Sequence, residues 1–253
     1  MVVTDGSQLD EAEVRQIHAL RLALMRLRSD VDPDTDYVDV AAFVRKARYV
    51  VRALTPRGEL RACFVLRSTE RDILGRRCIV LLPEFGYAVP NLRGGQVARM
   101  FTRVMFQIRT LNWNRDIFIA GCGYPHSYNT FATAYDGAFH TLASKDIPAL
   151  DRAVLEDFLR EKLGRDDIGA GLLRVNVLHV EIEPRHLERL QRSRFYHEYV
   201  AQNPRWQDGY TLGFVVRADW RTLMASIWLR FFRPKHGEKP NAPSTSVSFR
   251  SSK

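Results

Sequence analysis

Between residues 77 and 121 the hydrophobic pattern of the chain changes from that of a strand to that of a helix and back again. Residues 77–89 are rich in β-branched and aromatic side chains, which favours a strand, and Pro90 ends it. Over residues 95–111 the apolar side chains recur at helical spacing, and residues 116–121 have the composition of a short buried strand. This order predicts a mixed α/β structure built around one principal sheet.

Further segments extend this pattern on both sides. Two β-rich runs, residues 48–55 and 60–68, flank a Pro-Arg-Gly-Glu turn and predict a hairpin, while Gly86 marks a bulge or a close approach within the next strand. Additional helices are expected over residues 10–28, 127–135, 150–163, 184–201 and 218–232, and additional strands over residues 172–182 and 210–216. We expect an N-terminal helix and loop over 1–36, a core over 37–183, a C-terminal extension over 184–233 that packs on the core, and a flexible tail over 234–253.

Composition excludes several classes of protein. The chain has 253 residues, of which 45% are apolar, so it is neither disordered nor fibrous. No window of about 18 residues is free of charge, so no membrane-spanning helix is expected. The first ten residues lack the pattern of a secretory signal. Three cysteines are too few for a disulfide scaffold or a zinc site, so we expect a reduced, cytoplasmic protein without a metal.

The chain is strongly basic. Its 38 lysine and arginine residues against 29 acidic residues leave a net charge of +9. Such an excess attracts anions, whether nucleic acid, acidic lipid or a phosphorylated cofactor, without choosing among them. A solvated basic surface is an equal alternative, because the arginines are scattered rather than gathered in one tract. No recognition helix or stacking motif favours nucleic acid, whereas peripheral contact with an anionic membrane stays open.

The junction between the strand and the helix, residues 88–101, has the features of a ligand-binding site. Gly94 and Gly95 lie between the strand end and the helix start, where glycines let backbone N–H groups turn toward a ligand. The helix directs its positive dipole end to the same place, and Arg93 and Arg99 add full charges. These features predict a phosphate or pyrophosphate site, with a simple glycine turn as the alternative. The stretch fits neither a Walker loop nor the dinucleotide Gly-x-Gly-x-x-Gly motif.

The same stretch resembles the coenzyme-A loop of the GNAT superfamily of N-acyltransferases. The usual form of that loop is Val-x-Pro-x-x-Arg-Gly-x-Gly-Ile/Val-Gly/Ala, followed by a helix. The residues that fit are Pro90, Arg93, Gly94, Val97 and Ala98. Gln96 stands where the family has its second key glycine, and the spacing from Val89 to Pro90 is one residue short. A Cβ atom at residue 96 would crowd the pyrophosphate contact.

A second stretch resembles the same family. Residues 127–139 are similar to the Asn-x-x-Ala-x-x-x-Tyr-x-x-x-Gly-Phe helix, with Asn129, Ala132, Tyr135 and Phe139 recognisable and two of the spacings one residue short. The hairpin over residues 49–67 matches the family's second and third strands, residues 77–89 the fourth, and residues 116–121 the fifth. The resemblance covers roughly residues 37–145 and leaves the C-terminal region outside.

This resemblance implies a fold, a co-substrate and a reaction. The fold is a central mixed, mostly antiparallel sheet flanked by helices, here with extra C-terminal strands and helices. An acetyl-CoA or longer acyl-CoA is implied between the fourth and fifth strands, and its acyl group passes directly to an amine acceptor that the sequence does not identify. The implied contacts to coenzyme A come from Val89, Arg93, Gly94, Gly95, Gln96, Val97, Ala98 and Asn129.

Two residues are candidates for proton transfer in such a reaction. Tyr135 matches the family's acid, which protonates the departing thiolate, and its alternative is a core aromatic residue. Glu84, on the fourth strand, is the candidate base, because a carboxylate in a cleft can have a raised pKa. Its alternative is an exposed strand glutamate, and His126 and His140 are the other candidate bases.

Other interpretations of the sequence stay open. Cys122, between Gly121 and Gly123, could be the nucleophile of an acyl hydrolase or transferase, although a buried structural cysteine is the commoner case. The helix over residues 218–232 has an aromatic face that could cap the core, cover an acyl chain or lie in an anionic membrane interface. A non-enzymatic basic protein that docks on anionic membrane or nucleic acid is the alternative from a different class.

Overall fold

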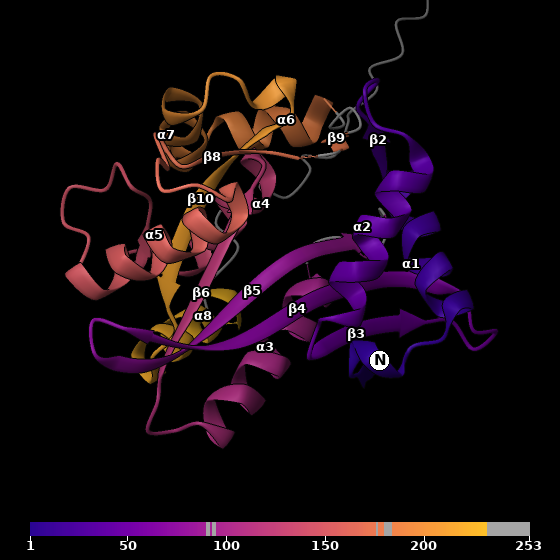
Figure 1. Cartoon of the computed structure of the whole chain (residues 1–253), viewed down its shortest axis with the longest axis horizontal. Coiled ribbons are helices and arrows are strands. Elements are labelled where there is room, and N and C mark those ends of the chain that lie inside the picture. The colour runs from indigo at the N-terminus through magenta and orange to yellow at the C-terminus, as the bar shows by residue number, and fades with distance from the viewer. Residues whose placement is uncertain (90–91, 93–94, 176, 180–183, 232–253) are drawn as a thin grey trace, which may run out of the picture.

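The computed structural model describes residues 1–89, 92, 95–175, 177–179 and 184–231. Its centre is an eight-stranded sheet in the order β1-β3-β4-β5-β6-β10-β7, with β8 also paired to β10 (Figure 1). The strands are β1 (Val2–Thr4), β3 (Tyr49–Leu54), β4 (Leu60–Ile73), β5 (Arg76–Ala88), β6 (Asp116–Gly123), β7 (Phe139–His140), β8 (Leu172–Arg174) and β10 (Tyr210–Arg217). Among these described strands β5 and β6 form the one parallel pair. The predicted mixed, mostly antiparallel sheet is confirmed.

Helices cover both faces of this sheet. One face carries α1 (Glu11–Leu24), α2 (Pro33–Arg45) and α5 (Ala149–Leu163), and the other carries α3 (Gly95–Leu111), α4 (Pro125–Ala134) and α8 (Trp220–Phe231). We call them the α5 face and the α3 face. Helices α6 (Pro184–Gln191) and α7 (Arg194–Gln202) pack against α4. No helix among the residues that the structure describes is long and apolar enough to cross a membrane.

The core follows from alternation along the strands. Phe64 and Leu66 of β4 lie in the cluster on the α3 face, whereas Val65 between them lies in the cluster on the α5 face. Successive side chains of a strand point to opposite faces of the sheet, so every second one faces the same layer of helices. Because the strand is apolar at both sets of positions, both clusters are buried. A central sheet sandwiched between two helical layers is therefore dictated by pattern alone.

The N-terminal region departs from the expected elements in two places. The helix expected over residues 10–28 ends at Leu24, because Met25–Leu27 forms β2 and pairs antiparallel with β9 (Val177–His179). The loop expected over residues 29–36 contains the start of α2, whose N-cap Asp32 accepts a hydrogen bond from the Thr35 N–H at 2.9 Å. Proline at the first helical position is the start signal that explains this helix. The boundary expected at residue 36 falls inside α2.

The C-terminal region completes the sheet instead of only packing on it. Strand β10 lies between β6 and β7, so residues 210–217 belong to the principal sheet. The strand expected over 172–182 is divided between β8 and β9, which belong to different sheets, and the helix expected over 184–201 is divided into α6 and α7. In α8, Leu223 is buried in the cluster on the α3 face, so this half of the helix caps the core. The tail over 234–253 lies outside the described residues.

Candidate functional site

The sheet divides between β5 and β6. Their parallel ladder runs from Cys78 opposite Asp116 to Leu81 opposite Ile119, and within the described residues no further pair joins them. Strand β5 nevertheless continues along β4 to Ala88, and β6 continues along β10 to Gly123. In Figure 1 β5 sweeps toward α2 while β6 runs toward α4. We call the diverging segments, residues 82–88 and 120–123, the β5–β6 fork.

The sequence of β5 explains why the ladder stops. Pro83 has no N–H group to donate, and the residue after it, Glu84, is an extra residue in the ladder with β4. Opposite Pro83, a Cβ atom on Gly121 would lie 3.0 Å from the proline Cγ atom and 3.2 Å from the Phe214 ring. Proline and bulge end the pairing, and the glycine accommodates the proline ring. The predicted close approach at Gly86 is confirmed, since a Cβ atom there would lie 2.8 Å from the Phe64 ring.

The predicted coenzyme loop connects β5 to α3. Arg93 and Gly94 lie outside the described residues, and Gly95, Gln96, Val97 and Ala98 form the first turn of α3, with side chains outside the described part of the structure. The Val89 carbonyl accepts a hydrogen bond from the Leu92 N–H at 2.9 Å. Strand β5 ends at Ala88 and helix α3 begins at Gly95, with the loop between them. The N–H groups of a first helical turn have no partner within the helix, which makes them available to an anion.

Tyr135 lies on the α3 face. It follows the last residue of α4, is 3% exposed, and belongs to the same buried cluster as Leu81 and Ile119, the last pair of the β5–β6 ladder. Its ring stacks on Phe131 with 6.2 Å between centroids. The candidate acid is therefore buried on the α3 face, in a cluster that also contains the last residue pair of the β5–β6 ladder.

Glu84 lies on the opposite face of the sheet, with α5. Its side chain is 5% exposed, so it is buried rather than the exposed strand glutamate of the alternative interpretation. One carboxylate oxygen accepts from Arg67 Nε at 3.0 Å and the other from Lys162 Nζ at 2.6 Å. The two candidate proton-transfer residues thus lie on opposite faces, with the fork between them. Both ion-pair partners are distant in sequence, and no local signal in the sequence indicates them.

The other polar candidates near the fork are held by the C-terminal region. Asn129 Oδ1 accepts a hydrogen bond from Ser193 Oγ at 2.5 Å, which ties α4 to the start of α7. Burial raises the pKa of the Cys122 thiol, a hydrogen bond with Thr211 and the Lys162 ammonium lower that pKa, and the Glu84 carboxylate raises it. A nucleophilic cysteine requires a lowered pKa, so the environment of Cys122 does not favour this role.

The two histidine candidates differ in position. His126 lies in the first turn of α4, directly after β6, whereas His140 lies on β7, separated from β6 by β10. Burial lowers the pKa of His140, and the nearby Asp151 carboxylate raises it. Among the described residues no group of three or more histidine, cysteine or acidic side chains could hold a metal ion.

Asp151 itself yields a prediction. It is 1% exposed, and its Oδ1 atom has no hydrogen-bond partner among the described residues. We expect Asp151→Asn to raise the free energy of unfolding at pH 7 by about 1 kcal/mol, because burial opposes the charged form of the carboxyl group and the amide has no charged form. Burial raises the pKa of Asp151 in the folded state. The stabilisation that the carboxyl group contributes to the folded state is therefore fully present below its unfolded-state pKa and is lost as the pH rises through its folded-state pKa.

Urea unfolding of wild type and variant between pH 4 and pH 7 measures this effect. The difference in unfolding free energy should shrink toward about pH 4, near the ordinary aspartate pKa. Asp146→Asn, at an exposed position before α5, is the matched control and should change little at either pH. Equal destabilisation by Asp151→Asn at both pH values would contradict the prediction.

The chain is only weakly similar to known proteins. No family model and no curated protein matches the chain. A probable N-acyltransferase from Enterococcus faecalis matches with a TM-score of 0.38 and 10% identity, over 55% of this chain and 32% of that one, so the match spans about a third of its length. The Rv2747 protein from Mycobacterium tuberculosis, in complex with CoA and NLQ, matches with a TM-score of 0.40 and 14% identity, over 86% of this chain and 99% of that one. A mutant of the BH1408 protein from Bacillus halodurans has a TM-score of 0.35 and 15% identity, over 59% of this chain and 100% of that one. Likeness of this degree does not transfer an activity.

Proposed function

We propose that this protein is a GNAT-type N-acyltransferase that uses acetyl-CoA or a longer acyl-CoA to acylate an amine. The observation that carries the proposal is the β5–β6 fork. The ladder between these strands stops after Leu81 and Ile119, β5 continues to Ala88, and the predicted coenzyme loop connects it to the start of α3 at Gly95. The family resemblance implies coenzyme A between the corresponding strands.

The fork has the chemistry that an acyl-CoA needs. Beyond the ladder β5 and β6 do not pair with each other within the described residues, and an extended ligand with amide groups can bond to such a strand edge. At the end of β6 the Gly123 carbonyl accepts a hydrogen bond from the Tyr199 hydroxyl at 3.0 Å, so the ligand would bond to other groups of the fork. The first turn of α3, with Arg93 before it, supplies N–H groups and positive charge for the diphosphate. The pantetheine arm then extends from the α3 terminus along the fork.

The reaction follows from this placement. The neutral amine nitrogen attacks the thioester carbonyl carbon, a C–N bond forms, and the C–S bond breaks. The nitrogen loses a proton to solvent, and the departing thiolate takes one from the Tyr135 hydroxyl. A phenol can serve because its ordinary pKa of about 10 is close to that of a thiol, about 8.5. The protein contributes mainly by holding the thioester and the amine in the attacking geometry.

Calorimetric titration with coenzyme A tests the proposal before any acceptor is known. We expect wild type to bind, and Arg93→Ala and Gly94→Val each to weaken binding about tenfold or more, because one removes a phosphate partner and the other blocks the approach of the backbone. Arg103→Ala, which removes an exposed charge farther along α3, is the matched control. Absence of coenzyme-A binding by wild type, with vesicle binding to anionic lipid that both variants retain, would instead support the basic docking protein.

A further inference from the structure

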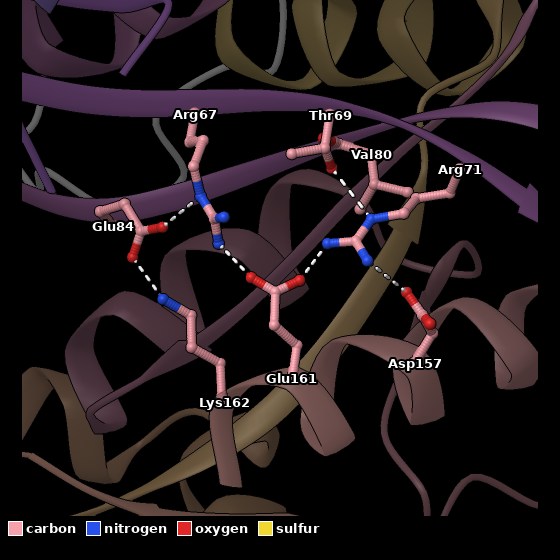
Figure 2. A network of polar contacts seen from close by, with 8 residues as sticks. All are labelled: Arg67, Thr69, Arg71, Val80, Glu84, Asp157, Glu161 and Lys162. Atoms are coloured by element: carbon pink, nitrogen blue, oxygen red, sulfur yellow. Dashed lines mark hydrogen bonds and ion pairs between the residues drawn. The ribbon is translucent and has the colours of Figure 1, made fainter. Parts of the chain in front are cut away.

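Glu84 belongs to a chain of ion pairs that joins β4 and β5 to the last turns of α5. The members of this network are Arg67, Arg71, Glu84, Asp157, Glu161 and Lys162 (Figure 2). Arg67 donates to Glu84 and, at 2.7 Å, to Glu161, so one guanidinium links a strand carboxylate to a helix carboxylate. Figure 2 shows the α5 side chains reaching toward the strands from below, and the strand side chains meeting them.

The network holds β5 at the point where the strand leaves β6. In the β4–β5 ladder Leu66 lies opposite Pro83 and Val65 lies opposite Phe85, so Glu84 is the extra residue of a bulge. Glu84 and Phe85 therefore both lie on the α5 face, the first in the ion network and the second against the cluster under α1 and α2. A bulge re-aims the strand, and here it coincides with the start of the fork.

Burial makes this attachment stiff. The side chains of Glu84, Arg67 and Lys162 are 5%, 19% and 21% exposed. Ion pairs that are shielded from water are strongly coupled, and removal of one partner leaves the others uncompensated. The charges of Lys162 and Glu84 also act on the Cys122 thiol of β6, whose pKa the first lowers and the second raises.

From this geometry, and resting on the proposed function, we infer that Glu84 is a positioning residue rather than the general base. Its pairs with Arg67 and Lys162 hold the bulge of β5 against α5 and so set the separation of the two strands that receive the acyl-CoA. Both carboxylate oxygens are occupied by cations of the protein itself, so Glu84 orients the strand and a substrate ammonium gives its proton elsewhere.

Coenzyme-A affinity distinguishes the two roles, because a base acts on the amine and does not contribute to coenzyme-A binding. We expect Glu84→Gln and Lys162→Met each to raise the Kd for coenzyme A about tenfold, since small displacements of a binding strand are costly. The double variant should bind coenzyme A no more weakly than Glu84→Gln alone, because both changes break the same Glu84–Lys162 pair. Lys162→Arg, which keeps the charge facing Glu84, should stay within about twofold of wild type.

Arg160→Met is the matched control. It removes an ion pair with Glu156 at 3.1 Å on the same helix, outside the network, and should leave the Kd unchanged. Thermal unfolding of every variant is measured alongside, and Lys162→Met decides the question if Glu84→Gln does not fold. A lowered Tm with an unchanged Kd would overturn the inference, because a merely structural role moves stability alone. Wild type that fails to bind coenzyme A would instead refute the proposed function.

Discussion

Asp36→Ala is expected to lower the free energy of unfolding by about 3–5 kcal/mol, the usual cost of breaking a buried ion pair. Asp36 is fully buried and receives two bonds from Arg21, Nη2 to Oδ1 at 2.6 Å and Nε to Oδ2 at 2.9 Å. His18 Nε2 lies 3.1 Å from Oδ2, and Arg21 Nη1 donates to the Tyr87 hydroxyl at 2.5 Å. One carboxylate therefore joins α1 and α2 to a strand of the fork.

Loss of this carboxylate leaves the Arg21 guanidinium buried without its counter-charge. Urea unfolding at neutral pH measures the loss, and Asp30→Ala is the matched control. Asp30 pairs with Arg28 at 2.6 Å but is 51% exposed, so its removal should cost less than about 1 kcal/mol. Equal costs for the two substitutions would show that the Asp36 network contributes no more than a surface pair.

Tyr135→Phe is expected to reduce acyl transfer about a hundredfold or more while leaving coenzyme-A affinity unchanged, the effect of removing a general acid. The phenyl ring fills the same space in the core against Phe131, so the fold is preserved. Release of the free coenzyme-A thiol from acetyl-CoA in the presence of a panel of amines measures the rate, and calorimetry measures the affinity.

Cys122→Ala provides the comparison for this experiment. Desolvation raises the pKa of the half-buried Cys122 thiol, so its removal should change the rate by less than about tenfold. The opposite pattern, with activity lost in Cys122→Ala and kept in Tyr135→Phe, would favour a cysteine-dependent transferase. Loss of coenzyme-A binding in Tyr135→Phe would indicate that the hydroxyl contributes to the pocket rather than to the chemistry.

The candidate site is only partly predictable from the sequence. Strand, glycine loop and helix are local features, so the pattern of residues 77–111 is sufficient to indicate the β5–α3 junction. Pro83, with Gly121 opposite it, ends the β5–β6 ladder, but nothing in the sequence places these two residues side by side. The strand position of Glu84 identifies it as a candidate, whereas its partners Arg67 and Lys162 come from other elements and reach it only because β4, β5 and α5 meet.

By itself the sequence determined the class of most elements and the layers of helices on one sheet, because apolar periodicity, caps and turn residues act over a few neighbouring positions. Helix α2, whose start was expected as a loop, is an exception despite its local cap at Asp32. Tertiary structure alone decided that β10 enters the sheet between β6 and β7, that residues 25–27 leave the helical pattern to pair with β9, and that Glu84 is buried between two cations. These outcomes depend on strand pairing and charge contacts between segments far apart in the chain. The strand pairs and ion pairs that stabilise them involve partners far apart in the sequence, so no short stretch of sequence predicts them.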